Sequence, residues 1–146
     1  MLSVFIFSNT RGQVVHHLDC GQKQTQREIN TCAMQNFVAA DGLLDSLYKS
    51  MVAEFSYARP EGSSDTTAPT PYLREALVQS QHSWYKYRED AGALISTSFD
   101  GGSAANAQAC EYMTLMTLDR IRALKNLRNY LYGKQALSVD WDISRH

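Results

Sequence analysis

The stretch TQREINTCAMQNFVAADGLLDSLYKSMVAEF, residues 25–55, decides the fold that the sequence predicts. It opens with a capping box, in which the side chains of Thr25 and Glu28 bond to each other's backbone amides. Apolar residues then recur every three or four positions, which is the spacing of one helix face. They are Ile29, Ala33, Phe37, Ala40, Leu44, Leu47, Tyr48, Met51 and Phe55. We therefore expect one long helix over about 25–57, with Gly42 as its weak point.

A second helix is predicted over about 71–97, because Thr70 and Pro71 form an N-cap and a first-turn proline. Its inward stripe consists of Leu73, Leu77, Ser80, Trp84, Arg88, Ala91 and Ile95. The segment between the first two helices, residues 59–71, holds three prolines and small polar residues and is predicted to be an exposed loop.

A third helix is predicted over about 104–132, after the glycine pair Gly101-Gly102 and with Ser103 as its cap. It ends near Gly133, and its inward face carries Cys110, Met113, Thr117, Ile121, Leu124 and Leu131. Three such helices, each with one apolar stripe, favour an all-α, up-down-up bundle.

Composition fits one globular domain, since the chain has 146 residues, of which 44% are hydrophobic and 20% charged. The net charge of -1 and the absence of a long apolar run argue against nucleic acid and a membrane span as partners. We expect residues 1–18 to be a leader, 19–133 the helical domain and 134–146 a tail. The apolar start of the leader is typical either of a truncated signal peptide or of a short first strand or loose, flexible N-terminal end.

Gln81, Trp84 and Arg88 share one side of the second helix, and a guanidinium in an apolar stripe needs acidic or carbonyl partners. The candidates are Asp41, which lies near Tyr48 on the first helix, and Asp119 on the third. We interpret these six residues as a structural polar core, with a polar binding pocket as the alternative.

No motif predicts catalysis, a metal or a cofactor. His16 and His17 precede Asp19 and Cys20, but their spacing matches no closed zinc site. No serine or cysteine has a base placed beside it, and no glycine-rich phosphate loop follows a strand. The basic residues of the third helix spread around its axis, which indicates a solvated face and not a nucleic-acid surface. They are Arg120, Arg122, Lys125, Arg128 and Lys134.

An ordered series of short motifs resembles the LprI-like domain family. The series comprises Asp19-Cys20, Thr25-x-x-Glu28-Ile29-Asn30-x-Cys32, Asp41-x-x-Leu44-x-x-x-Tyr48, Gln81-x-x-Trp84-x-x-x-Arg88, Gly101-Gly102-Ser103 with Cys110, and Thr117-x-x-Arg120-x-x-x-Leu124. The family is named for a lysozyme inhibitor, and most members are small secreted or periplasmic bacterial proteins. The resemblance therefore implies export, a binding function and no enzymatic activity.

The same resemblance implies a disulfide framework. Family members commonly have four cysteines, whereas this chain has three, with Gly92 near the position of the missing one. We expect a Cys32–Cys110 bridge, or alternatively a Cys20–Cys110 bridge. The remaining thiol could then link two copies into a homodimer.

The 59–71 loop is the expected partner-binding segment, through Glu61, Ser63, Ser64 and Asp65. Acidic and hydroxyl groups suit the basic rim of a lysozyme cleft, although the same residues fit a plain hydrophilic connector. The predicted partner is a lysozyme-type muramidase in the periplasm or outside the cell. An immunity or envelope-stress protein that binds another toxin or enzyme, and a structural part of an envelope complex, are the alternatives.

Overall fold

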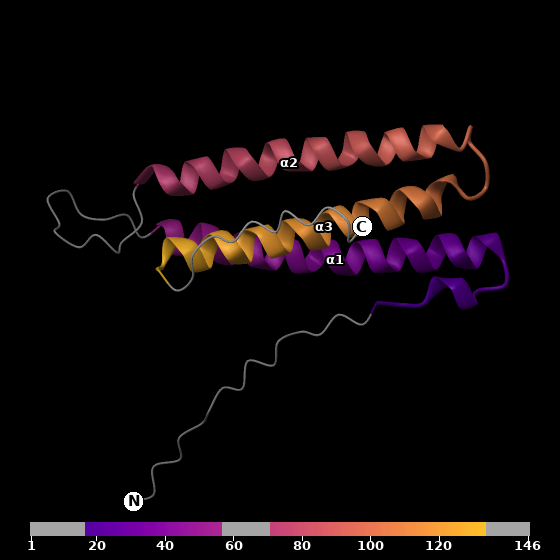
Figure 1. The fold of residues 1–146 in the computed structure, drawn as a ribbon, viewed down its shortest axis with the longest axis horizontal. Helices are drawn as coiled ribbons and strands as arrows, with labels where there is room; N and C mark the ends of the chain where they lie inside the picture. The colour runs from indigo at the N-terminus through magenta and orange to yellow at the C-terminus, as the bar shows by residue number, and fades with distance from the viewer. Residues whose placement is uncertain (1–16, 57–70, 134–146) are drawn as a thin grey trace, which may run out of the picture.

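The computed structural model describes residues 17–56 and 71–133, and three long helices make up most of them. They are α1 (Gln26–Ser56), α2 (Pro71–Ser98) and α3 (Ala105–Leu131), preceded by a short 3-10 turn, η1 (Cys20–Gln22). The helices lie side by side in an up-down-up order, and η1 folds back beside the start of α1 (Figure 1). This confirms the predicted all-α bundle, with boundaries within one or two residues of those expected.

The capping box forms as the sequence predicts. The Thr25 amide donates to Glu28 Oε2 at 2.9 Å, and the Glu28 amide donates to Thr25 Oγ1 at 3.2 Å. The Thr25 hydroxyl also donates to Glu28 Oε2 at 2.8 Å, and the hydrogen bonds from the Thr25 hydroxyl and amide lower the pKa of Glu28 by favouring its carboxylate form. The start of α1 is therefore fixed by its own first turn.

The start of α3 differs from the expectation that Ser103 caps it. Ala104 occupies the N-cap position with helical backbone angles and makes no side-chain cap bond. The Ser103 carbonyl instead accepts a hydrogen bond from Asn30 Nδ2 of α1 at 3.1 Å. The tight turn through Asp100 and Gly101, both with positive φ, carries the chain one residue further before the helix begins. The first turn of α3 is thus tied to α1 and not capped locally.

Two apolar clusters form the core. The larger one lies toward the ends of α1 and α3 and centres on Leu44, Met51, Phe55, Leu77, Ile121 and Leu124. The smaller one joins the other ends of the same two helices through Ala33, Ala107 and Cys110. The small side chains there let α1 and α3 approach closely. Helix α2 adds few buried apolar side chains, and two of its buried residues, Gln81 and Arg88, are polar.

The disulfide pairing predicted from the resemblance is wrong, both as Cys32–Cys110 and in its alternative form. Cys20 bridges to Cys32, with their Cα atoms 5.7 Å apart. The reason is that the segment before α1 folds back over that helix. Asn36 holds it there, accepting from the Leu18 amide at 2.8 Å and donating to the Leu18 carbonyl at 3.0 Å.

The unpaired thiol is Cys110, which is only 1% exposed in the small-residue contact between α1 and α3. Burial raises the pKa of this thiol, because the apolar surroundings disfavour a thiolate. A homodimer linked through the unpaired cysteine would require Cys110 to leave this contact. The nearby Gly92 faces Met113, whose side chain fills the space at the position where the family commonly has its third cysteine.

Two helical glycines give a matched test of this packing. A Cβ at Gly42 would meet nothing within 4 Å, whereas a Cβ at Gly92 would lie 2.6 Å from Met113 Sδ. We expect Gly42→Ala to stabilise the protein by about 0.5–1 kcal/mol, because alanine loses less backbone entropy in a helix. Gly92→Ala should lose stability by ~1 kcal/mol through overpacking against Met113. Urea unfolding of both variants checks this, and an equal gain for the two would contradict the packing at Gly92.

Candidate functional site

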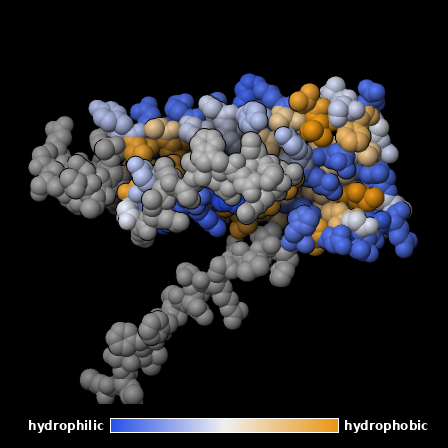
Figure 2. All heavy atoms as spheres, in the orientation of Figure 1, coloured by the Kyte–Doolittle hydropathy of each residue, from blue (hydrophilic) through white to orange (hydrophobic). Residues whose placement is uncertain are grey.

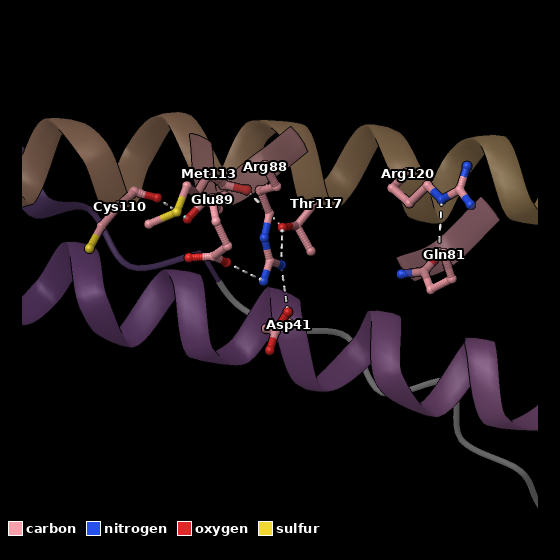
Figure 3. A network of polar contacts seen from close by, with 9 residues as sticks. Asp41, Gln81, Arg88, Glu89, Cys110, Met113, Thr117 and Arg120 are labelled. Carbon is pink, nitrogen blue, oxygen red and sulfur yellow. Dashed lines mark hydrogen bonds and ion pairs between the residues drawn. The ribbon is translucent and has the colours of Figure 1, made fainter. Parts of the chain in front are cut away.

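The polar centre of the bundle is built around Arg88, which α2 carries into the space between α1 and α3. Arg88 Nη1 lies 2.6 Å from Asp41 Oδ1 and donates to Thr117 Oγ1 at 3.1 Å. Its Nη2 lies 3.1 Å from Glu89 Oε1. One side chain therefore contacts all three helices, as Figure 3 shows.

Three aromatic rings surround the same guanidinium. Arg88 Cζ lies 4.9 Å from the ring centroid of Phe37 and 5.1 Å from those of Trp84 and Tyr85. A planar guanidinium can stack on such rings while its edge bonds to a carboxylate. Arg88 itself is 4% exposed, whereas the Asp41 side chain is 40% exposed. The pair is thus buried on one side only, and Asp41 keeps part of its hydration.

Asp119 does not join this centre, contrary to the expectation. Its Oδ1 accepts from Arg122 Nη1 at 2.7 Å, and both side chains are exposed. Tyr48 packs against the larger apolar cluster. Of the two acidic partners suggested for Arg88, the structure brings only Asp41 to it.

A second arginine, Arg120, lies further along α3 beside Gln81 (Figure 3). Arg120 Nε donates to Gln81 Oε1 at 3.0 Å, and Nη2 donates to Ser80 Oγ at 2.9 Å. Its Cζ lies 5.8 Å from the centroid of the Trp84 ring. Burial lowers the pKa of Arg120, because a half-buried guanidinium loses hydration. Within the described residues no carboxylate pairs with it, unlike Arg88 and Arg128, which have Asp41 and Glu54.

Arg120 opens onto a groove between α2 and α3 with a volume of about 380 Å³. Aromatic and apolar side chains, among them Trp84, Tyr87, Tyr112 and Met116, line it together with the charged side chain of Asp119. Tyr87 is 62% exposed and Tyr112 40% exposed. Figure 2 shows apolar residues at the surface of α2 near the α2–α3 turn. Large aromatic side chains around an arginine are typical of the energetic centres of protein interfaces.

Sequence reasoning missed several of these residues. The helical periodicity placed Phe37 and Thr117 on the inward faces, but it did not predict that both contact Arg88. Tyr85, Tyr87 and Tyr112 fell outside every stripe, and only the adjacency of the two α2 tyrosines to Trp84 signals an aromatic surface. Arg120 was assigned to a solvated basic face, whereas it is half-buried between two helices.

The other predicted site residues fall partly outside the described ranges. The loop residues Glu61, Ser63, Ser64 and Asp65, as well as His16, lie outside them. His17 Nε2 lies 3.4 Å from Asn36 Nδ2. Across residues 17–56 and 71–133, no group of three or more His, Cys, Asp or Glu side chains is arranged to hold a metal ion. None of the helices found there has the length and apolar character that a membrane crossing needs.

Comparison with known proteins shows that the sequence matches one protein family. A family model described as lysozyme inhibitor LprI matches residues 19–124, most of the chain. An uncharacterized protein of Rhizobium meliloti is 30% identical over 109 residues, which cover 75% of this chain and 78% of the relative. No solved structure matches the chain.

The arrangement around Arg88 predicts that lysine cannot replace it. An ammonium group loses the planar stacking on three rings and cannot bond to Asp41, Thr117 and Glu89 in the same geometry. We expect Arg88→Lys to lower the free energy of unfolding by about 2–4 kcal/mol, as measured by urea denaturation. The control is Arg122→Lys, at an exposed pair on α3, which should change it by less than about 0.5 kcal/mol. Equal effects at the two positions would contradict the role given to Arg88.

Proposed function

Because this chain belongs to the lysozyme inhibitor LprI family, we propose that it is an exported protein that binds and inhibits a lysozyme-type muramidase at the bacterial cell envelope. The observation that carries this proposal is the family match across residues 19–124, which spans all three helices. The protein acts by binding and not by catalysis, and it needs no cofactor.

The Cys20–Cys32 bridge supports the extracytoplasmic location. Disulfides persist in the periplasm and outside the cell, whereas cytosolic thiols are kept reduced. The bridge joins the segment before α1 to the second turn of that helix, so it is part of the folded domain. Export to the periplasm or the medium therefore agrees with the chemistry of the fold.

The 59–71 loop is the proposed contact with the enzyme, because the helices on either side of it are firmly held. Phe55, just before it, is 1% exposed in the larger core cluster, and Leu77 of α2 belongs to the same cluster. Arg128 Nη2 of α3 lies 2.5 Å from Glu54 Oε1 and ties the end of α1 to the bundle. A loop on a rigid support loses less entropy when it binds. Glu61 and Asp65 would meet the basic rim of the enzyme's cleft.

The test is a lysis assay in which the oxidised, full-length protein is titrated into several lysozyme types and the clearing of a bacterial suspension is followed. We expect at least one type to be inhibited until lysis stops near an equimolar ratio. Glu61→Gln with Asp65→Asn should raise the inhibition constant about tenfold, equivalent to ~1.4 kcal/mol of binding free energy.

The matched control is Asp100→Asn, which also removes a carboxylate but lies at the opposite end of the bundle, in the α2–α3 turn. Asp100 has a φ of 48°, a conformation that asparagine accepts well, so the fold should be unaffected. Undiminished lysis by every lysozyme type at a large molar excess of the protein would overturn the proposed function. Equal losses of inhibition in the loop variant and in Asp100→Asn would overturn the proposed contact.

A further inference from the structure

The groove between α2 and α3 extends beyond its aromatic part. A second hollow of about 230 Å³ lies next to it, toward the C-terminal end of α3, and Arg120 lines both. Leucines form much of the second hollow, including Leu73 and Leu77 of α2 and Leu124 and Leu127 of α3. The two hollows meet at the Arg120 guanidinium, and the polar side chains of Asp119 and Ser80 complete their linings.

That guanidinium has only neutral partners among the described residues. The oxygens that accept its hydrogen bonds belong to Gln81 and Ser80, and its ring contact is with Trp84. A half-buried guanidinium next to exposed aromatic rings gains from an occupant that brings a further electron-rich ring.

The chain itself supplies a segment with these properties. Residues 137–144 read Leu-Ser-Val-Asp-Trp-Asp-Ile-Ser, in which apolar and polar residues alternate strictly. Alternation is typical of an extended segment with one apolar row, which needs an apolar surface to cover it. The apolar row contains the large indole of Trp141, and Asp140 and Asp142 stand on either side of it.

The length of this segment matches the groove. It starts at Gly133, whose φ of 63° ends α3 and lets the chain turn back. At roughly 3.3 Å per extended residue, Leu137 reaches about 13 Å from Gly133 and Trp141 about 26 Å. At about 1.5 Å per helical residue, Leu124 lies ~14 Å and Met116 ~26 Å from the same point. Leu137 and Trp141 of an extended segment therefore lie about as far from Gly133 as the residues of α3 that line the two hollows.

We propose that residues 137–143 dock in extended form along the α2–α3 groove, antiparallel to α3. Leu137 covers the leucine hollow, and Trp141 enters the aromatic hollow at the level of Met116, next to the Arg120 guanidinium. Asp140 and Asp142 form the outer row and keep the covered surface polar. This docking goes beyond the inhibitory function and does not rest on it, since it involves none of the acidic or hydroxyl residues of the 59–71 loop.

The experiment uses the two tryptophans of the full-length chain, Trp84 and Trp141. In a Trp84→Phe variant Trp141 is the sole reporter, and we expect a blue-shifted emission with acrylamide quenching several-fold weaker than for the free peptide 134–146. Adding Ala123→Arg, which fills the groove from an exposed position, should raise the quenching to the level of the peptide. The control is Ala93→Arg at an exposed position of α2 that does not line the groove, and it should leave the quenching low.

A second pair of variants keeps Trp84 in place and so controls for any damage that Trp84→Phe does to the groove. With Trp84 as the sole reporter, Trp141→Ala should increase its quenching relative to Trp141→Phe, because only the phenylalanine still covers the groove. Quenching of Trp141 at the level of the free peptide in the Trp84→Phe protein would overturn the proposal, provided that far-UV circular dichroism shows an intact fold. Shielding that disappears on dilution would also overturn it, in favour of docking onto a second copy.

Discussion

The contact between the Arg88 guanidinium and Asp41 is the constraint on which the arrangement of the three helices depends. Helices α1 and α3 can pair through apolar and small side chains alone. Helix α2 buries Leu77 and packs Leu73, Trp84 and Tyr85 against the larger cluster. Arg88 adds a directional constraint on its register, because the guanidinium meets a carboxylate, a hydroxyl and three rings. No other position along α2 brings a cation to these groups.

Burying the polar side chains of Arg88 and Gln81 has a cost in free energy. Two buried donors, Arg88 Nε and Gln81 Nε2, find no acceptor within the described part of the chain, and each such group is expected to cost about 1–3 kcal/mol. The disulfide, the capping box and the Asn36 contact offset part of this cost at the opposite side of α1. Specificity of packing, more than stability, is what a buried ion pair of this kind provides.

The sequence predicts the helices because they follow from local periodicity, and it predicts that Arg88 needs a buried partner without deciding between Asp41 and Asp119. The capping box and the inward stripe at 25–55 depend only on residues one or two turns apart. Cysteine pairing cannot be predicted in this way, since it depends on how the chain folds back before α1. The role of Ser103 cannot either, since it depends on a hydrogen bond from Asn30 of another helix. Asp119 could not be excluded as a partner of Arg88 by spacing, because the rotation of α3 about its axis is set by the packing of Ala107 and Cys110.

A double-mutant cycle between Arg88 and Asp41 tests most directly whether their contact determines how α2 packs on the other two helices. The free energies of unfolding of Arg88→Gln, Asp41→Asn and the double variant are compared with that of the parent protein under the same urea conditions. We expect a coupling free energy of about 1–3 kcal/mol, since the two groups form one charge-assisted bond that is buried on the Arg88 side. Additive effects, within about 0.5 kcal/mol, would contradict it and would assign the register of α2 to the apolar contacts alone.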